Sequence, residues 1–222
     1  MYRLLIFTLL SIFISSCYKT EKSDNILTTD TLDIADSSKI QDTFDRDSVA
    51  IVQLKVEYGQ MLIWLYDQTP LHKANFINLV ESKFFNGQTF NRVVRNFVIQ
   101  GGCPDTSSIG HTNYPIKPEF NSNLRHTYGA VGMGRYGLEI NPDTLSNGCQ
   151  FYIVSDTSGE HQLDDLYVVF GILIDGFETL DQINKVRTGF LNDIPEEEIN
   201  FELEIIKIPK RSLFEDYGFI IS

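Results

Sequence analysis

FNRVVRNFVIQGG (Phe90–Gly102) and GCQFYIV (Gly148–Val154) are the two most informative stretches of this sequence. Both contain short apolar runs of the length of a β-strand. Arg92 and Gln100 lie inside the first stretch, and Gln150 lies inside the second. A charged or amide side chain is costly to bury unless a partner or a ligand satisfies it. The two stretches therefore predict a functional site built on strands.

The sequence on either side of these stretches predicts mainly strands. The folded part is expected to start near residue 49, and apolar and polar residues alternate from 52 to 58, which is typical of a half-buried strand. Residues 61–66 form its hairpin partner, with the turn expected at Gly59-Gln60. Residues 104–127 are rich in Pro, Asn and Ser and predict a long loop. Further strands are expected at 130–133, 150–154, 167–172 and 201–208.

Two helices are expected among the strands. Thr69 and Pro70 predict a helix start, with Thr69 as the N-cap and Pro70 at the first helical position. A second helix follows Asp175-Gly176. Many short strands and two helices predict a mainly β protein, a closed antiparallel barrel capped by helices. The apolar positions of the two helices are Ala74, Phe76, Leu79 and Val80 in the first and Phe177, Leu180 and Ile183 in the second.

Three motifs closely resemble the signature of the cyclophilin-type peptidyl-prolyl isomerases. FNR (90–92), FVIQGG (97–102) and GCQFYI (148–153) stand where that family has Phe-His-Arg, Phe-Met-x-Gln-Gly-Gly and Gly-Ser-Gln-Phe-Phe-Ile. The resemblance continues through VVFG (168–171) and covers roughly residues 49–210. It implies an eight-stranded antiparallel barrel over a domain of residues 48–210. Residues 211–222 remain as a tail with no assignment.

The resemblance implies an enzyme that accelerates rotation about X-Pro peptide bonds. Resonance stiffens the C–N bond and gives a barrier of roughly 18–20 kcal/mol. The catalyst must bind the twisted amide more tightly than either planar form. No bond is made or broken, so we expect neither a cofactor nor a metal. By resemblance, Arg92 donates a hydrogen bond to the prolyl nitrogen, and Gln100 orients Arg92 and the substrate carbonyl.

The resemblance also implies a substrate pocket with several departures from the family pattern. Val98 replaces Met, and Tyr152 replaces Phe and adds a hydroxyl that must find a partner. Alternation along the strand predicts that Phe151 faces the core instead. Tyr136–Leu145 is longer than the usual connection. The expected proline pocket is Phe97, Val98, Tyr152 and Leu163, joined by Tyr167 in place of a pocket His, and the flanking peptide is expected on Gln150 and the backbone of Gly134 and Arg135.

Several residues have a structural interpretation beside the functional one. Gln150 either binds peptide or satisfies buried backbone, and His126 is predicted to be structural. Cys103 and Cys149 either pair or remain separate, partly buried thiols, and we expect separate thiols. Sequence alone does not supply the backbone separation that a disulfide requires.

The N-terminal sequence predicts a bacterial lipoprotein. Residues 1–16 combine Arg3, an apolar run and small residues before Cys17, the expected site of lipidation. Residues 17–47 are polar and predict a flexible tether. Tyr18 in place of Asp favours the outer membrane. The formal net charge of −12 excludes nucleic acid as a partner, and nothing in the sequence indicates more than a monomer.

Three functions follow from these patterns. The first is a membrane-tethered isomerase that accelerates folding of exported, proline-containing polypeptides in the bacterial envelope. The second is a binding module of the same fold that holds proline-containing segments with little catalysis. The third is a structural envelope lipoprotein. The pairing of Arg92 with Gln100 favours the isomerase, because binding alone does not require an arginine directed at the amide nitrogen.

Overall fold

The computed structural model describes residues 47–103, 115–190 and 192–221. Residues 1–46 lie outside the described residues; they hold the predicted signal sequence, the predicted lipidation site Cys17 and nearly all of the predicted tether. Residues 104–114 of the predicted 104–127 loop also lie outside them. No helix within the three described ranges is long and apolar enough to cross a membrane.

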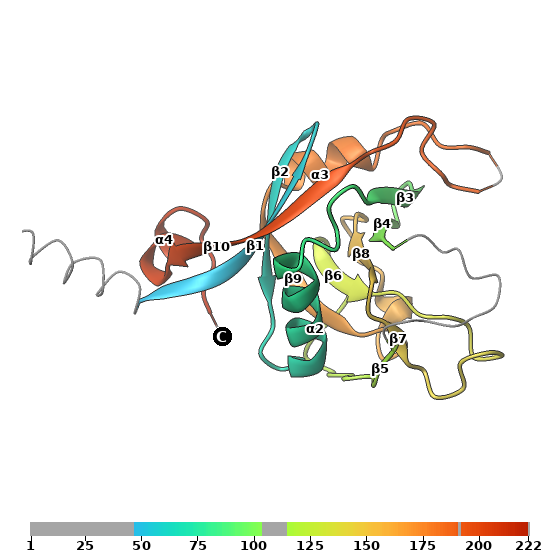
Figure 1. Cartoon of the computed structure of the whole chain (residues 1–222), viewed down its shortest axis with the longest axis horizontal. Coiled ribbons are helices and arrows are strands. Elements are labelled where there is room, and N and C mark those ends of the chain that lie inside the picture. Colours follow the sequence, from blue (N-terminus) through green and yellow to red (C-terminus); the bar gives the residue numbers. More distant parts are fainter. Residues whose placement is uncertain (1–46, 104–114, 191, 222) are drawn as a thin grey trace, which may run out of the picture.

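An eight-stranded antiparallel sheet forms most of the molecule, as predicted (Figure 1). Its strand order is β10-β1-β2-β9-β6-β8-β4-β3. Two short strands, β5 (Pro115–Ile116) and β7 (Ser146–Asn147), pair separately. The strands of the main sheet are β1 (Ser48–Val56), β2 (Gly59–Leu65), β3 (Thr89–Val94), β4 (Val98–Gly102), β6 (Ala130–Met133), β8 (Gln150–Val154), β9 (Val169–Asp175) and β10 (Phe201–Pro209).

The sheet curls into a half-barrel, so the prediction of a fully closed barrel is wrong. The edge strands β3 and β10 meet at a single bridge between Thr89 and Asn200. Two backbone hydrogen bonds, Phe90 N to Ile199 O at 3.0 Å and Phe201 N to Gln88 O at 3.2 Å, support that contact. β10 begins at the bridge and pairs along its whole length with β1. The contact between β3 and β10 therefore ends where β10 starts. Among the described residues, no ladder of paired residues closes the gap between these two edge strands, which we call the seam.

A cluster of phenylalanines fills the concave interior of the sheet. Phe90 and Phe201 lie with ring centroids 5.0 Å apart across the open seam, and Phe151 lies 5.6 Å from Phe201. The predicted orientation of Phe151 toward the core is confirmed, because its side chain is fully buried. Tilted and edge-on ring pairs stabilise such a core beyond the burial of apolar area. The fully buried phenylalanines are Phe76, Phe85, Phe90, Phe151, Phe170 and Phe201.

The predicted first helix, α2 (Pro70–Glu81), starts where the sequence indicates, but a different residue caps it. Thr69 occupies the N-cap position without a side-chain capping bond, and its hydroxyl contacts Tyr66 O instead. Glu119 caps the helix from a distant loop, accepting from Leu71 N and His72 N, each at 3.0 Å. A carboxylate satisfies the free N–H groups of a helix start and interacts well with its dipole.

Smaller differences from the sequence predictions concern edges and ends. The β1–β2 turn lies at residues 57–58, so Gly59 already belongs to β2. Ala74 is exposed, whereas Phe76, Leu79 and Val80 are buried as expected. β9 starts two residues later than predicted and runs on to Asp175. The second helix, α3 (Phe177–Ile183), is confirmed.

The C-terminal tail, which the sequence left unassigned, packs against the sheet. It contains α4 (Lys210–Glu215), which lies beside β1 and β10 on the side away from β3 and β4 (Figure 1). Leu213 of α4 is fully buried in a cluster with Trp64 and Ile174. The ring of Phe219 lies 5.7 Å from that of Trp64. The tail therefore extends the folded domain beyond its predicted end at residue 210.

We predict that Glu119→Ala lowers the free energy of unfolding by about 1–3 kcal/mol, because two N–H groups of the helix start and buried His72 lose their acceptor. Urea-induced unfolding measures this change. Glu81→Ala, an exposed position at the other end of α2, is the matched control. Equal losses in the two variants would contradict the capping role.

Candidate functional site

The pairing of β4 with β8 places the predicted site residues on one face of the sheet. In this ladder Gln100 lies opposite Tyr152, and Gly102 lies opposite Gln150. On the other side of β4, Gln100 lies opposite Arg92 of β3. Successive side chains of a strand point to opposite faces. Gln100, Gln150 and Tyr152 therefore share the face away from Phe151 and the core.

A cavity of about 220 Å³ opens on this face, and it brings together all ten residues that the sequence predicted for the substrate site. One additional residue, Tyr136, lines it and was missed. Its position directly after Gly134 and Arg135 was the available signal. The lining residues are Arg92, Phe97, Val98, Gln100, Gly134, Arg135, Tyr136, Gln150, Tyr152, Leu163 and Tyr167.

Arg92 lies at the rim of the cavity and keeps part of its guanidinium in solvent. Its side chain is 39% exposed. Its Nη1 donates to Gln100 Oε1 at 3.4 Å, and its guanidinium carbon lies 6.0 Å from the centroid of the Phe97 ring. Nε of Arg92 lies 3.7 Å from a carboxylate oxygen of Asp193, whose side chain is 45% exposed. A solvent-exposed ion pair at this distance contributes little stability, so the guanidinium is held mainly through Gln100.

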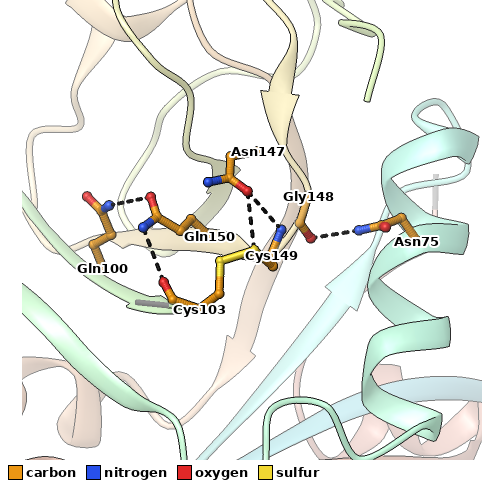
Figure 2. Close-up of a disulfide and its surroundings, with 7 residues drawn as sticks. All are labelled: Asn75, Gln100, Cys103, Asn147, Gly148, Cys149 and Gln150. Carbon is orange, nitrogen blue, oxygen red and sulfur yellow. Dashed lines mark hydrogen bonds between the residues drawn. A yellow bond between two sulfur atoms is a disulfide. The ribbon is translucent and has the colours of Figure 1, made fainter. Parts of the chain in front are cut away.

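Two glutamines extend a series of hydrogen bonds from Arg92 into the protein interior. Gln100 Nε2 donates to Gln150 Oε1 at 3.3 Å, and Gln150 Nε2 donates to the carbonyl oxygen of Cys103 at 3.2 Å (Figure 2). Gln150 is only 6% exposed. We call this series, from Arg92 through Gln100 and Gln150 to Cys103, the hydrogen-bond chain. Gln150 thus satisfies a backbone carbonyl, as the structural interpretation predicts, and it also lines the cavity, whereas its binding of peptide stays a prediction.

The wall expected to bind the flanking peptide is held by backbone and side-chain bonds. Both backbone groups of Gly134 already have partners, since its N donates to Gln150 O at 2.8 Å and its O accepts from Asn147 N at 2.7 Å. The Arg135 side chain donates to Leu166 O at 2.7 Å and lies 4.6 Å from the Tyr167 ring centroid. The guanidinium of Arg135 therefore fixes the rim around Tyr167.

Tyr152 forms the floor of the cavity, and its hydroxyl has a buried partner that the sequence did not predict. Its oxygen lies 2.7 Å from His126 Nε2, and His126 Nδ1 lies 2.8 Å from Asp164 Oδ1. An ionised carboxylate only accepts, so Nδ1 carries the proton and the Tyr152 hydroxyl donates to Nε2. His126 is thus structural, as expected, and supports the pocket floor. The only sequence signal for this contact was the additional hydroxyl of Tyr152.

Burial and hydrogen bonding set the protonation states of Tyr152, His126 and Asp164. Desolvation lowers the pKa of His126, although its bond to Asp164 acts in the opposite direction. Burial alone would raise the pKa of Asp164, but hydrogen bonds from His126 and His161 hold it below its usual value. Burial raises the pKa of Tyr152 well above its usual value. A neutral imidazole therefore lies between a neutral phenol and a carboxylate.

Cys103 and Cys149 form a disulfide, so our expectation of separate thiols is wrong (Figure 2). Their Cα atoms are 5.4 Å apart, within the range that a disulfide spans. The two cysteines adjoin the last pair of the β4–β8 ladder, and Cys103 N donates to Cys149 O at 2.8 Å. Gly102 allows this approach, because its φ is +112° and a Cβ there would lie 2.0 Å from Cys149 O.

No cluster of three or more His, Cys, Asp or Glu side chains within the described ranges is arranged to hold a metal ion. The buried His72 contacts Glu119 and Ser146 instead. His111 lies outside the described residues.

Comparison with known proteins identifies the family. The model of the family described as cyclophilin type peptidyl-prolyl cis-trans isomerase/CLD matches residues 51–206. A peptidyl-prolyl cis-trans isomerase-like 3 of Dictyostelium discoideum is 37% identical over 154 residues, which cover 67% of this chain and 89% of that protein. A peptidyl-prolyl cis-trans isomerase of Acinetobacter baylyi is 33% identical over 171 residues, which cover 73% and 86%.

A solved structure gives the same result. The crystal structure of a cyclophilin type peptidyl-prolyl cis-trans isomerase of Cryptosporidium parvum, in the presence of the dipeptide Ala-Pro, superposes with a TM-score of 0.60 at 29% identity. It covers 69% of this chain and 98% of the other. The chain therefore belongs to the cyclophilin-type peptidyl-prolyl cis-trans isomerases, and the predicted enzyme class and the predicted mainly β, eight-stranded antiparallel fold are confirmed, apart from the closure of the barrel.

We predict that the free energy of unfolding falls as the pH is lowered from 7.5 to 5.5. Burial lowers the pKa of both His72 and His126 in the folded chain, whereas unfolded histidines titrate near pH 6.5. Below that pH the unfolded state binds more protons, which destabilises the fold by at most about 1.4 kcal/mol per histidine for each pH unit.

Urea-induced unfolding at pH 7.5, 6.5 and 5.5 measures this dependence. His126→Gln removes one of the two titrating groups and is expected to reduce the slope. A free energy of unfolding that stays constant or increases toward pH 5.5 would contradict neutral buried imidazoles.

Proposed function

We propose that the cavity accelerates X-Pro isomerisation by arginine-assisted stabilisation of the twisted prolyl amide. In the twisted state the prolyl nitrogen regains its lone pair and becomes a hydrogen-bond acceptor. The planar amide accepts poorly at that nitrogen, so a donor placed there binds the transition state selectively. The guanidinium of Arg92 stays charged and presents a rigid fork of donors.

The position of Arg92 beside an apolar pocket is the observation that carries this proposal. Phe97, Val98, Tyr152 and Leu163 supply the apolar surface for a proline ring, and Arg92 stands at its edge. The cavity of about 220 Å³ is smaller than the roughly 300–1,000 Å³ of pockets for drug-sized ligands. That size suits one ring with its neighbouring amides. The partly exposed guanidinium is free to reach an amide nitrogen while Gln100 orients it.

We predict that Arg92→Ala lowers kcat/KM about ten- to a hundredfold, because a charge-assisted hydrogen bond made in the transition state is lost. A protease-coupled cis-to-trans assay on an Ala-Pro-Phe peptide measures the rate, and circular dichroism checks the fold. Arg95→Ala is the matched control, since Arg95 is exposed on the same β3–β4 hairpin and donates to Lys185 O. Equal rates for wild type and Arg92→Ala would favour a proline-binding module instead.

We propose further that the isomerase acts in a bacterial envelope, anchored by lipid at Cys17. The charged start, apolar run and small residues of 1–16 support processing before Cys17. Residues 17–47 give the folded domain reach from the membrane surface. Exported polypeptides that fold there are the substrate class that fits this position, and Tyr18 after the cysteine favours the outer membrane. Several acyl chains give stable anchoring, whereas a single chain binds marginally.

We predict that Cys17→Ala abolishes lipid labelling of the protein. Bacteria expressing the full chain are grown with radiolabelled palmitate and then fractionated. Ser16→Ala, which keeps a small residue before the cysteine, is the matched control and should remain labelled. Labelling that persists in Cys17→Ala would contradict anchoring at this residue.

A further inference from the structure

The Cys103–Cys149 disulfide lies directly behind the hydrogen-bond chain. Gln150 is the residue after Cys149, and its Nε2 donates to the carbonyl of Cys103 (Figure 2). The disulfide thus joins Cys149, the residue just before β8, to Cys103, whose carbonyl ends the hydrogen-bond chain from Arg92.

The chemistry of the donors sets the direction of every bond in this chain. A guanidinium only donates, so Gln100 must present Oε1 to Arg92 and therefore Nε2 to Gln150. Gln150 must then present Oε1 to Gln100 and Nε2 to a further acceptor. The carbonyl of Cys103 is that acceptor, 3.2 Å away. A flip of either amide would oppose two donors, so Arg92 at one end and the carbonyl of Cys103 at the other both favour this one orientation of the two glutamines.

The disulfide restrains the carbonyl of Cys103. Cys103 lies just beyond Gly102, which forms the last pair of the β4–β8 ladder. The next residue is Pro104, which has no N–H, so the following peptide group donates no backbone hydrogen bond. Among the described residues, the backbone bond from Cys103 N to Cys149 O and the disulfide itself tie this position to Cys149. Cys149 is a firm support, since it is only 4% exposed.

We propose that the Cys103–Cys149 disulfide is a positioning element for the isomerase reaction, and that turnover depends on its oxidised state. The inference rests on the proposed role of Arg92. Breaking the disulfide releases the carbonyl of Cys103, Gln150 and Gln100 then lose their fixed orientation, and the guanidinium of Arg92 loses the acceptor that directs it. The disulfide acts through these residues and does not itself contact substrate.

The redox step requires a dithiol reductant. One reductant thiolate attacks the sulfur of Cys103, which is the less buried partner, and the sulfur of Cys149 leaves and takes up a proton. The second reductant thiol resolves the mixed disulfide, which yields two protein thiols and one reductant disulfide. The Cys149 thiol has an acceptor in place, because its Sγ lies 3.3 Å from Asn147 Oδ1.

Cys149 stands where the family pattern described above has Ser, and Cys103 directly follows the Gly-Gly of that pattern. The two cysteines lie 46 residues apart in the sequence, and the fold brings them into contact.

The experiment compares the oxidised full chain with the same chain reduced by dithiothreitol. Exchange NMR on an Ala-Pro peptide measures turnover and peptide affinity without a coupling protease, and near-UV circular dichroism gives the folded fraction. Per folded molecule, we expect reduction to lower turnover about three- to tenfold and to change the Kd for peptide less than about twofold. Cys103→Ala/Cys149→Ala should have the lower turnover with or without dithiothreitol.

Gln150→Ala separates positioning from a general loss of stability. It interrupts the hydrogen-bond chain, so reduction should not lower its turnover further. Three results would overturn the inference: a folded reduced chain that turns over as fast as the oxidised one, a loss that only follows the unfolded fraction, or an equal response to reduction in Gln150→Ala and wild type. An oxidised wild-type chain without activity would instead contradict the proposed function itself.

Discussion

The antiparallel pairing of β4 with β8 positions both the site residues and part of the aromatic core. It sets Gln100 opposite Tyr152 and Gly102 opposite Gln150. One face of this pair supplies the cavity, and the other supplies Phe151 to the phenylalanine core. A shift by one residue would exchange the two faces. The aromatic core therefore stabilises the fold and also holds the register of the site.

The site combines apolar surface with very few polar groups, each of which has a partner. Arg92 is directed by Gln100, and Tyr152 is held by His126. Such an arrangement suits a reaction in which no bond is made or broken, because catalysis then requires only a shaped pocket and one donor in position. Behind the pocket, Gln100 accepts from Arg92 and donates to Gln150.

The sequence predicted several strands and the pocket residues well, but it did not predict specific contacts between residues far apart in the chain. The bounds of β6 and β8 match the predicted 130–133 and 150–154, and the ten predicted pocket residues line one cavity. The Glu119 cap, which acts 48 residues from Leu71, was not predictable, because periodicity describes only neighbours along the chain. For the same reason the disulfide and the open β3–β10 seam required the three-dimensional pairing. The packed tail was missed because α4 is a short helix with a single buried position, Leu213.

The central claim is that Arg92 stabilises the twisted amide rather than the bound peptide. Line-shape NMR on a saturating Ala-Pro peptide measures this directly, because it separates interconversion on the protein from binding. We predict that Arg92→Ala slows the bound-state interconversion by more than about tenfold while the Kd for peptide changes by less than about threefold. Unchanged interconversion with a large rise in Kd would show that Arg92 only binds substrate and would contradict the account.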